Sequence, residues 1–185
     1  MQRLFICEKI QNGKYKNGVN MKRIIIHWTA GTYYPSNYEK QFYHYLIDKD
    51  GKVHNGFYKP EDNLNCIDGK YAAHTGGGNT GSIGVAMCSM AGFISSLKLG
   101  NYPITKIQFE SCMNFCASLC LKYKIDVNSD SIMTHYEFGK KNPKTSSNGK
   151  IDIIYIPPYP WVSKEDTGSF IRSKIRWYIS KRLKG

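Results

Sequence analysis

The sequence predicts a single α/β domain in which helices flank a central β-sheet. Segments typical of strands and of helices are mixed along the chain, and this mixture favours the α/β class. A chain of 185 residues is long enough to enclose one full hydrophobic core. Hydrophobic residues make up 41% of the composition and aromatic residues 14%, which indicates a packed globule rather than a disordered chain.

The first strand is predicted at KRIIIHW, residues 22–28, because a run of three isoleucines is typical of a buried strand. A short helical turn is expected next, at SNYEKQFY, residues 36–43. Ser36 and Glu39 have the spacing of a capping box, in which each side chain bonds the backbone N–H of the other residue.

The middle of the chain predicts a hairpin, a long loop and a second buried strand. Residues 43–58 are expected to form the hairpin, with its turn at Asp50 and Gly51. The loop DNLNCIDGKYAAHTGGGNTG, residues 62–81, is rich in glycine, and long loops on a compact domain are often functional. SIGVAMCSM, residues 82–90, follows as the strand.

The second half begins with the clearest helix, at residues 105–123. Thr105 and Gln108 form a capping box at its start, and apolar side chains recur at helical spacing. The remaining predicted elements are a strand in SIMTHYEF (residues 131–138) that ends at His135, an extended run in IDIIYIPP (151–158), and a basic amphipathic helix from Ser163 onward.

Six cysteines are present, and Cys112, Cys116 and Cys120 recur every fourth residue, so they share one face of the predicted helix. A stripe of small apolar side chains facing the core explains this spacing better than a metal cluster does. Since the sequence contains no Cys-x-x-Cys pair, synthesis in a reducing compartment is the simpler interpretation.

The formal net charge is +12, and basic residues are densest near the C-terminus. A charge of this size attracts polyanions, which include nucleic acid, anionic lipid and anionic cell-wall polymer. Specific nucleic-acid binding is not expected, because the sequence has no recognition helix or basic-aromatic motif. The basic residues of the last helix form either a solvated face or a surface drawn to an anionic wall or membrane. They are Arg172, Lys174, Arg176, Lys181 and Arg182.

Two of the predicted strands end in a histidine, His27 and His135. Imidazoles at neighbouring strand ends are a common beginning of a zinc site, which needs a third protein ligand if it is catalytic. Asp152, in GKID, is the candidate for that ligand, because zinc accepts carboxylate oxygen. Spacing alone leaves simpler interpretations open: strand-end histidines bonded to backbone, and an aspartate that caps a turn.

Lys150 lies two residues before Asp152, and in an extended segment residues i and i+2 point to the same face. A cation in that position would face the oxyanion that forms when a carbonyl is attacked at a metal centre. The simpler alternative is a solvated lysine, since several lysines precede it in KKNPK.

Four motifs occur in one order along the chain: IIIHWTAG, FYHYLIDKDGKV, AAHTGGGNTGSIGVAM, and THYEF followed by GKID. Together they resemble the zinc-dependent N-acetylmuramoyl-L-alanine amidases of the type 2 family, which includes phage lysozyme-amidases and shares the fold of the peptidoglycan-recognition proteins. The resemblance covers roughly Lys22 to Ile156. It implies a mixed central sheet with helices packed on it, and a groove that holds Zn²⁺.

The resemblance also implies roles for five residues. The family's zinc ligands fall on His27, His135 and Asp152, the last being Cys or Asp in the family. Its catalytic lysine, two positions before the third ligand, matches Lys150, and its catalytic tyrosine matches Tyr43 in YHYLI. A buried strand aromatic is the simpler alternative for Tyr43.

The glycine-rich loop matches the part of the family that lines the substrate groove. His74 and Asn79 are therefore expected to bind the stem peptide, with a solvated loop as the alternative. Thr29 completes the predicted substrate-binding set and is also a candidate to support the metal ligands. Some members carry a glutamate base in the strand after SIG; here that position holds Ala86, which favours the tyrosine and lysine instead.

The resemblance implies hydrolysis of the amide bond between N-acetylmuramic acid and L-alanine in peptidoglycan, for cell-wall lysis or remodelling. The alternative is a non-catalytic peptidoglycan-binding module of the same fold, which the loss of a metal ligand would indicate; all three candidates are present. Residues 22–185 are the predicted amidase domain, and residues 1–21 an extension or strap. We expect a monomer.

The expected route to the wall starts in the cytoplasm. No stretch approaches the roughly 18 apolar residues of a transmembrane helix, and the first residues contain no cleavage site of a signal peptide. We therefore expect synthesis in the cytoplasm and action on the cell wall, with release by a holin-type protein as one route.

Overall fold

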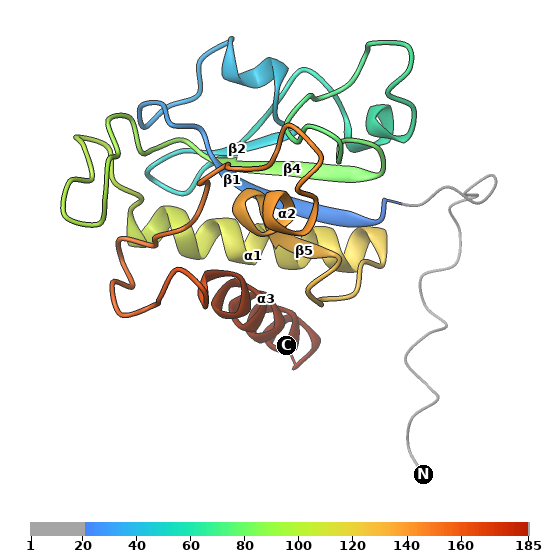
Figure 1. Cartoon of the computed structure of the whole chain (residues 1–185). Coiled ribbons are helices and arrows are strands. Elements are labelled where there is room, and N and C mark those ends of the chain that lie inside the picture. The colour runs from blue at the N-terminus through green and yellow to red at the C-terminus, as the bar shows by residue number, and fades with distance from the viewer. Residues whose placement is uncertain (1–20, 185) are drawn as a thin grey trace.

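The computed structural model describes residues 21–184, and it contains one five-stranded mixed sheet (Figure 1). The strands lie in the order β3-β2-β4-β1-β5, and all neighbours are parallel except β2 and β3. The mixed sheet predicted above is therefore confirmed. The strands are β1 Arg23–Trp28, β2 Tyr45–Ile47, β3 Val53–Asn55, β4 Ser82–Met87 and β5 Ile132–Thr134.

Two long helices cover one face of the sheet, as Figure 1 shows: α1 lies against the sheet and α3 lies beyond α1. A short helix, α2, follows β5 at the edge of the sheet. No helix of the described chain is both long enough and apolar enough to cross a membrane. The helices are α1 Lys106–Tyr123, α2 His135–Lys141 and α3 Thr167–Lys184, with 3-10 turns η1 Glu39–Gln41 and η2 Pro60–Leu64.

The two faces of β1 have different neighbours, because side chains alternate along a strand. Ile24, Ile26 and Trp28 belong to the main hydrophobic core, which lies between the sheet and α1. Ile25 packs in a small second cluster on the opposite face. His27 follows the alternation of Ile25, so the imidazole is carried to the face of the sheet that the long helices leave free.

The core contains the cysteine stripe that the sequence predicted. Cys112, Cys116 and Cys120 are buried in the main core on the face of α1 that packs against the sheet. The capping box at the start of α1 is also confirmed, since Thr105 accepts a hydrogen bond from the backbone of Gln108 at 3.1 Å. The side-chain amide of Gln108 donates to the carbonyl of Ile47 in β2 and to the carbonyl of Cys88, which directly follows β4.

Three predicted boundaries are wrong. His135 does not end a strand; it is the first residue of α2, because Thr134 serves as the N-cap of that helix. Residues 151–158 form consecutive turns instead of an extended run, since buried Ile153 and Ile156 fold inward to the core rather than pairing with a strand. The last helix begins at Thr167, after a turn in which Ser163 bonds Asp166. The predicted extension at residues 1–21 lies, except for Met21, outside the described residues.

Candidate metal centre

Three side chains that are distant in sequence meet beside the carboxyl end of β1. Nδ1 of His27 lies 3.0 Å from Oδ2 of Asp152, and Nδ1 of His135 lies 3.2 Å from the same oxygen. One ligand atom from each of the three residues lies within 4.8 Å of the others. Both imidazoles are buried, and the Asp152 side chain is 14% exposed, so the cluster opens toward solvent through the carboxylate. The sequence predicted these three residues as the ligand set, and the structure brings them together.

The parallel pairing of β1 and β5 places the two histidines side by side. Ile26 of β1 is in register with Thr134 of β5, so the next residue of each segment lies at the same edge of the sheet. The imidazole rings of His27 and His135 are 4.6 Å apart between centroids. The geometry of two neighbouring parallel strands therefore supplies two of the three ligand atoms.

Asp152 reaches the site from a loop that its neighbour anchors. Ile153 is fully buried in the main core, and its φ of +65° is a left-handed conformation that β-branched residues rarely adopt. Such a conformation persists only where the surrounding packing enforces it. The backbone carbonyl of Asp152 also accepts a hydrogen bond, at 3.5 Å, from the N–H of Tyr136 in α2. The loop is thus fixed on both sides of the carboxylate.

The outer nitrogen of His135 has a hydrogen-bond partner of its own. Nε2 of His135 lies 3.0 Å from Oγ of Ser147. The Ser147 hydroxyl donates its own proton to the carbonyl of Gly76 at 2.8 Å, so it accepts from the imidazole. Without a metal ion, Nδ1 of His135 faces the carboxylate of Asp152, which accepts hydrogen bonds; with a metal ion bound at Nδ1, the contact with Ser147 would keep the proton on Nε2.

His27 is fixed in the same way through a second buried histidine. Nε2 of His74 lies 3.5 Å from the carbonyl of Ser82, which only accepts, so His74 is protonated on Nε2. Nδ1 of His74 then accepts from Nε2 of His27 at 3.2 Å, and the hydroxyl of Thr75 lies within reach of both. These contacts would likewise keep the proton of His27 on Nε2 when its Nδ1 binds a metal ion.

The donor set suits zinc. Two imidazole nitrogens and one carboxylate oxygen lie within 4.8 Å of one another, and donor atoms gathered in this way can bind a cation between them. Catalytic zinc is bound by three protein ligands of these kinds and keeps a position for water or substrate. The outer hydrogen bonds of both histidines to serine, threonine and histidine are the kind that orient metal-binding imidazoles.

The local pKa values favour the protonation states that metal binding requires. Burial lowers the pKa of His27 to about 4. Burial, followed by repulsion from His27 and His44, lowers the pKa of His74 well below its usual value. Burial alone would raise the pKa of Asp152, but its contacts with His135 and His27 outweigh burial and lower it. Near neutral pH, His27 and His74 are therefore neutral and Asp152 is ionised.

Two cavities have Asp152 and Lys150 in their linings. The first, of about 280 Å³, is lined by Thr29, Tyr43, His74 and His135 among others. Burial, then the charges of Asp152 and Glu39, raise the pKa of Tyr43, so its phenol stays protonated and can act as an O–H donor. Its ring lies 5.2 Å from that of His27.

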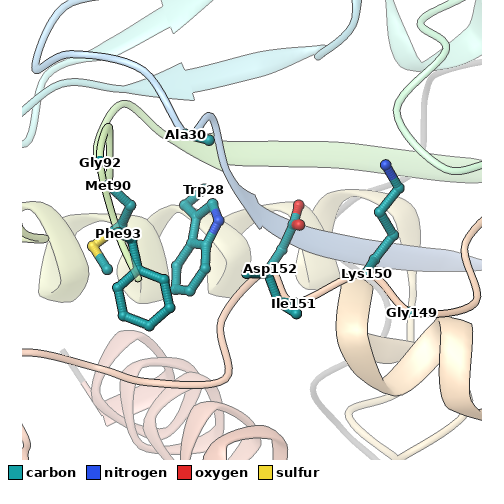
Figure 2. A pocket seen from close by; sticks show the side chains of 9 residues that line it. All are labelled: Trp28, Ala30, Met90, Gly92, Phe93, Gly149, Lys150, Ile151 and Asp152. Atoms are coloured by element: carbon teal, nitrogen blue, oxygen red, sulfur yellow. The ribbon is translucent and has the colours of Figure 1, made fainter. Parts of the chain in front are cut away.

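The second cavity, of about 290 Å³, is more apolar (Figure 2). Trp28, Met90 and Phe93 form its inner wall, and the rings of Trp28 and Phe93 are 5.0 Å apart between centroids. Figure 2 shows the side chains of Lys150 and Asp152 extending to the same side of their loop. The same-side placement of the two side chains agrees with the prediction, although their segment is a turn and not a strand.

The three predicted substrate-binding residues lie in different surroundings. Oγ1 of Thr29 accepts from the N–H of Gly31 at 3.1 Å and of Ser89 at 3.3 Å, so it fastens the turn after β1 and also lines the first cavity. His74 is buried behind His27 as described. Asn79 holds the glycine-rich loop by accepting from the N–H of Thr75, and it lines neither cavity. Contact of these residues with a stem peptide stays a prediction.

Sequence reasoning missed Ser147 and Thr75, whose hydroxyls hold the ligand histidines. Both lie in polar loops, where serine and threonine are common, so their types give no signal. Gly84 gives a weak signal that a side chain packs on β4. A Cβ there would lie 2.5 Å from Cγ of His74, so only glycine lets this ring pack on the strand. Ala86, at the position where some family members carry a glutamate, lies in register with His27.

Comparison with solved structures found several chains that are similar to this one. A mutant form of PlyL is 19% identical, with a TM-score of 0.49, over 85% of this chain and 86% of that chain. The amidase LysC from Clostridium intestinale URNW is 15% identical, with a TM-score of 0.48, over 89% and 94%. The Drosophila peptidoglycan recognition protein SD is 19% identical, with a TM-score of 0.46, over 73% and 80%.

Comparison of the sequence with curated proteins and with family profiles gave one match, to a family. No curated protein matches the chain. The profile of a family described as N-acetylmuramoyl-L-alanine amidase matches residues 17–150. The matched range includes His27, His135 and Lys150, and it ends just before Asp152.

Proposed function

Because the chain belongs to the N-acetylmuramoyl-L-alanine amidase family, we propose that it uses zinc to hydrolyse the amide bond between N-acetylmuramic acid and L-alanine in peptidoglycan. The observation that carries the proposal is the convergence of His27, His135 and Asp152 on one position within 4.8 Å. This position lies where two cavities join, so a chain-like substrate can extend to both sides of it.

In the proposed reaction, the side chains of His27, His135 and Asp152 hold the metal through Nδ1, Nδ1 and a carboxylate oxygen. When bound, zinc polarises a carbonyl and lowers the pKa of a coordinated water from 15.7 to about 7, so that a nucleophile is available near neutral pH. The buried, neutral state of His27 keeps its lone pair available at that pH.

Lys150 and Tyr43 have complementary proposed roles. Lys150 lines both cavities beside Asp152, and from there its ammonium group can stabilise the negative charge that develops on the lactyl carbonyl oxygen of muramic acid. Tyr43 remains a phenol because its pKa is raised, so it orients the attacking water or passes a proton toward the leaving amine of L-alanine. The glycan strand itself stays intact.

The competing function is a peptidoglycan-binding module of the same fold without catalysis. The presence of the three metal-binding side chains and of Lys150 favours the enzyme, because binding alone requires none of them. The proposed place of action is accordingly the bacterial cell wall.

The first test is digestion of purified peptidoglycan, analysed by mass spectrometry. We expect free stem peptides with a new L-alanine amino terminus, together with unbroken glycan. A zinc chelator should abolish their release and added zinc should restore it. His135→Ala is the matched negative control, because it removes one ligand while the rest of the cavity stays.

Two results would contradict the proposal. Cleavage within the glycan would assign the protein to a different reaction. Intact wall after treatment with folded protein that demonstrably holds zinc would favour the binding module.

A further inference from the structure

The proposed ligand His135 directly follows a short strand at one edge of the sheet. β5 has only three residues, pairs with β1 on one side and forms the edge of the described sheet. A short edge strand leaves backbone groups on its outer side without a ladder partner. The position of His135 therefore depends on what holds that outer side.

Arg172 of α3 occupies this outer side. Its Nη1 donates to the carbonyl of Ile132 in β5 at 2.9 Å. The same guanidinium makes three contacts of 3.1 Å with the two carboxylate oxygens of Glu137 in α2. The Arg172 side chain is 11% exposed and that of Glu137 is 21% exposed, so the pair is largely shielded from water.

Glu137 connects Arg172 to Thr134, the residue directly before His135. Its Oε2 accepts from the backbone N–H of Thr134 at 3.0 Å, while Oγ1 of Thr134 accepts from the N–H of Glu137 at 3.0 Å. This capping box encloses His135, which lies between its two members. The contacts of Arg172 on Ile132 and Glu137 thus hold the backbone on both sides of the ligand.

A glycine in α3 makes the contact feasible. A Cβ at Gly168 would lie 1.9 Å from Oε1 of Glu137 and 2.1 Å from its Cδ. Only glycine therefore lets the first turn of α3 approach the carboxylate this closely. Since Gly168 lies one helical turn before Arg172, the same face of α3 supplies both the space and the cation.

We infer that Arg172 and Glu137 are positioning residues for the metal centre: α3 holds His135 in place and thereby sets the affinity for zinc. The inference rests on the proposed zinc-dependent function. Neither residue lines the cavities at Asp152, so the effect is transmitted through the backbone of Thr134 and His135. Loss of an outer partner of a metal ligand typically weakens metal binding by about 10- to 100-fold.

The test measures zinc affinity by competition with a chromophoric chelator. Arg172→Met should weaken zinc binding by about tenfold or more. Arg172→Lys should recover only part of the loss, because an ammonium group cannot reproduce the forked contact with Glu137. Arg176→Met is the matched control: Arg176 lies one turn further along α3 and donates to Val127, which adjoins no ligand. Its zinc affinity should equal that of the unmodified protein.

A second readout separates positioning from general destabilisation. The visible absorption of the cobalt-substituted protein reports ligand geometry, so Arg172→Met should alter that spectrum while far-UV circular dichroism stays unchanged. If Arg172→Met does not fold, Glu137→Gln carries the test, because it keeps an oxygen for the Thr134 cap and loses the charge that Arg172 binds. It too should weaken zinc binding.

Unchanged zinc affinity and an unchanged cobalt spectrum in folded Arg172→Met, or in Glu137→Gln, would overturn the inference while leaving the proposed function intact. Failure of the unmodified protein to bind zinc would overturn the proposed function, and the inference with it.

Discussion

At the scale of single residues, hydrogen bonds at the outer nitrogens of two histidines orient the candidate centre. His27 and His135 each donate from Nε2, to His74 and Ser147, and these partners end at backbone carbonyls. These contacts orient both imidazoles and would keep the protons on Nε2 when Nδ1 binds a metal ion, which lowers the reorganisation that binding requires.

Lys150→Ala tests the proposed role of the lysine directly. We expect the variant to keep its zinc content and to lose about 10²–10³ in kcat, the usual loss when an oxyanion donor is removed. The measurement is the rate of stem-peptide release from soluble peptidoglycan fragments, together with metal analysis of the purified protein.

Lys140→Ala is the control for this experiment, since Lys140 lies on the outside of α2 over the ring of Tyr136. It should retain the full rate. A normal kcat in Lys150→Ala would remove the lysine from the chemistry, and a loss of zinc would show that it acts through the metal ligands instead.

The residues that meet at the candidate centre were easier to predict than the residues that support them. His27, His135, Asp152 and Lys150 stand in motifs whose order and spacing are informative. His74 was noticed as a loop residue, but its burial behind His27 depends on the fold of the glycine-rich loop over β4. Local sequence carries no signal for such a contact, because the two residues are far apart in the chain.

At the scale of elements, patterning predicted the long and regular segments well. α1 begins and ends within a residue of its prediction, because a capping box and a helical apolar stripe mark it. The prediction of an extended run at residues 151–158 was wrong. Isoleucines favour strands, but here burial of Ile153 and Ile156 in the main core outweighs strand pairing.

The junction of α1 with the sheet depends on one buried amide. Nε2 of Gln108 donates to the carbonyl of Ile47 at 2.8 Å and to that of Cys88 at 2.9 Å. Gln108→Leu removes this donor from the carbonyl of Cys88, whereas the carbonyl of Ile47 keeps the backbone N–H of Cys88 at 2.8 Å. Since an unsatisfied buried group costs about 1–3 kcal/mol, we expect the free energy of unfolding to fall by about 2–3 kcal/mol.

Urea denaturation followed by circular dichroism measures this change. Gln41→Leu, an exposed glutamine in η1, is the control and should change the free energy of unfolding by less than about 0.5 kcal/mol. A loss equally small in Gln108→Leu would show that the amide is not needed where α1 meets the sheet.

At the scale of the whole molecule, the charge is positive and α3 carries an exposed part of it. Arg176, Trp177, Lys181 and Lys184 are exposed on this helix, and Nζ of Lys181 lies 4.3 Å from the centre of the Trp177 ring. A cationic surface with an exposed indole is suited to an anionic polymer or membrane. The formal charge of +12 adds a long-range attraction to such a target.

We expect this surface to speed the encounter with anionic cell wall. Replacing Lys181 and Lys184 together by Gln should lower the rate of wall lysis roughly two- to tenfold at low salt, with little effect near roughly 0.5 M NaCl, because salt screens the attraction. Turbidity of cell-wall suspensions across a salt series measures this.

A double variant with Lys52 and Lys70 replaced by Gln loses the same charge elsewhere and should show a smaller effect. Equal effects of the two variants would assign the attraction to net charge rather than to α3. Lysis that does not depend on salt in the unmodified protein would remove electrostatic attraction altogether.

The order of strands has a consequence for synthesis on the ribosome. β1 is made first, yet its partners β4 and β5 follow much later, and the carboxylate that joins His27 lies 125 residues further along the chain. A nascent chain therefore displays an apolar IIIHW segment until β4, its first partner in the sheet, has been made at residues 82–87. The strand that builds the centre of the finished sheet is paired on both of its edges only after β5 has also emerged.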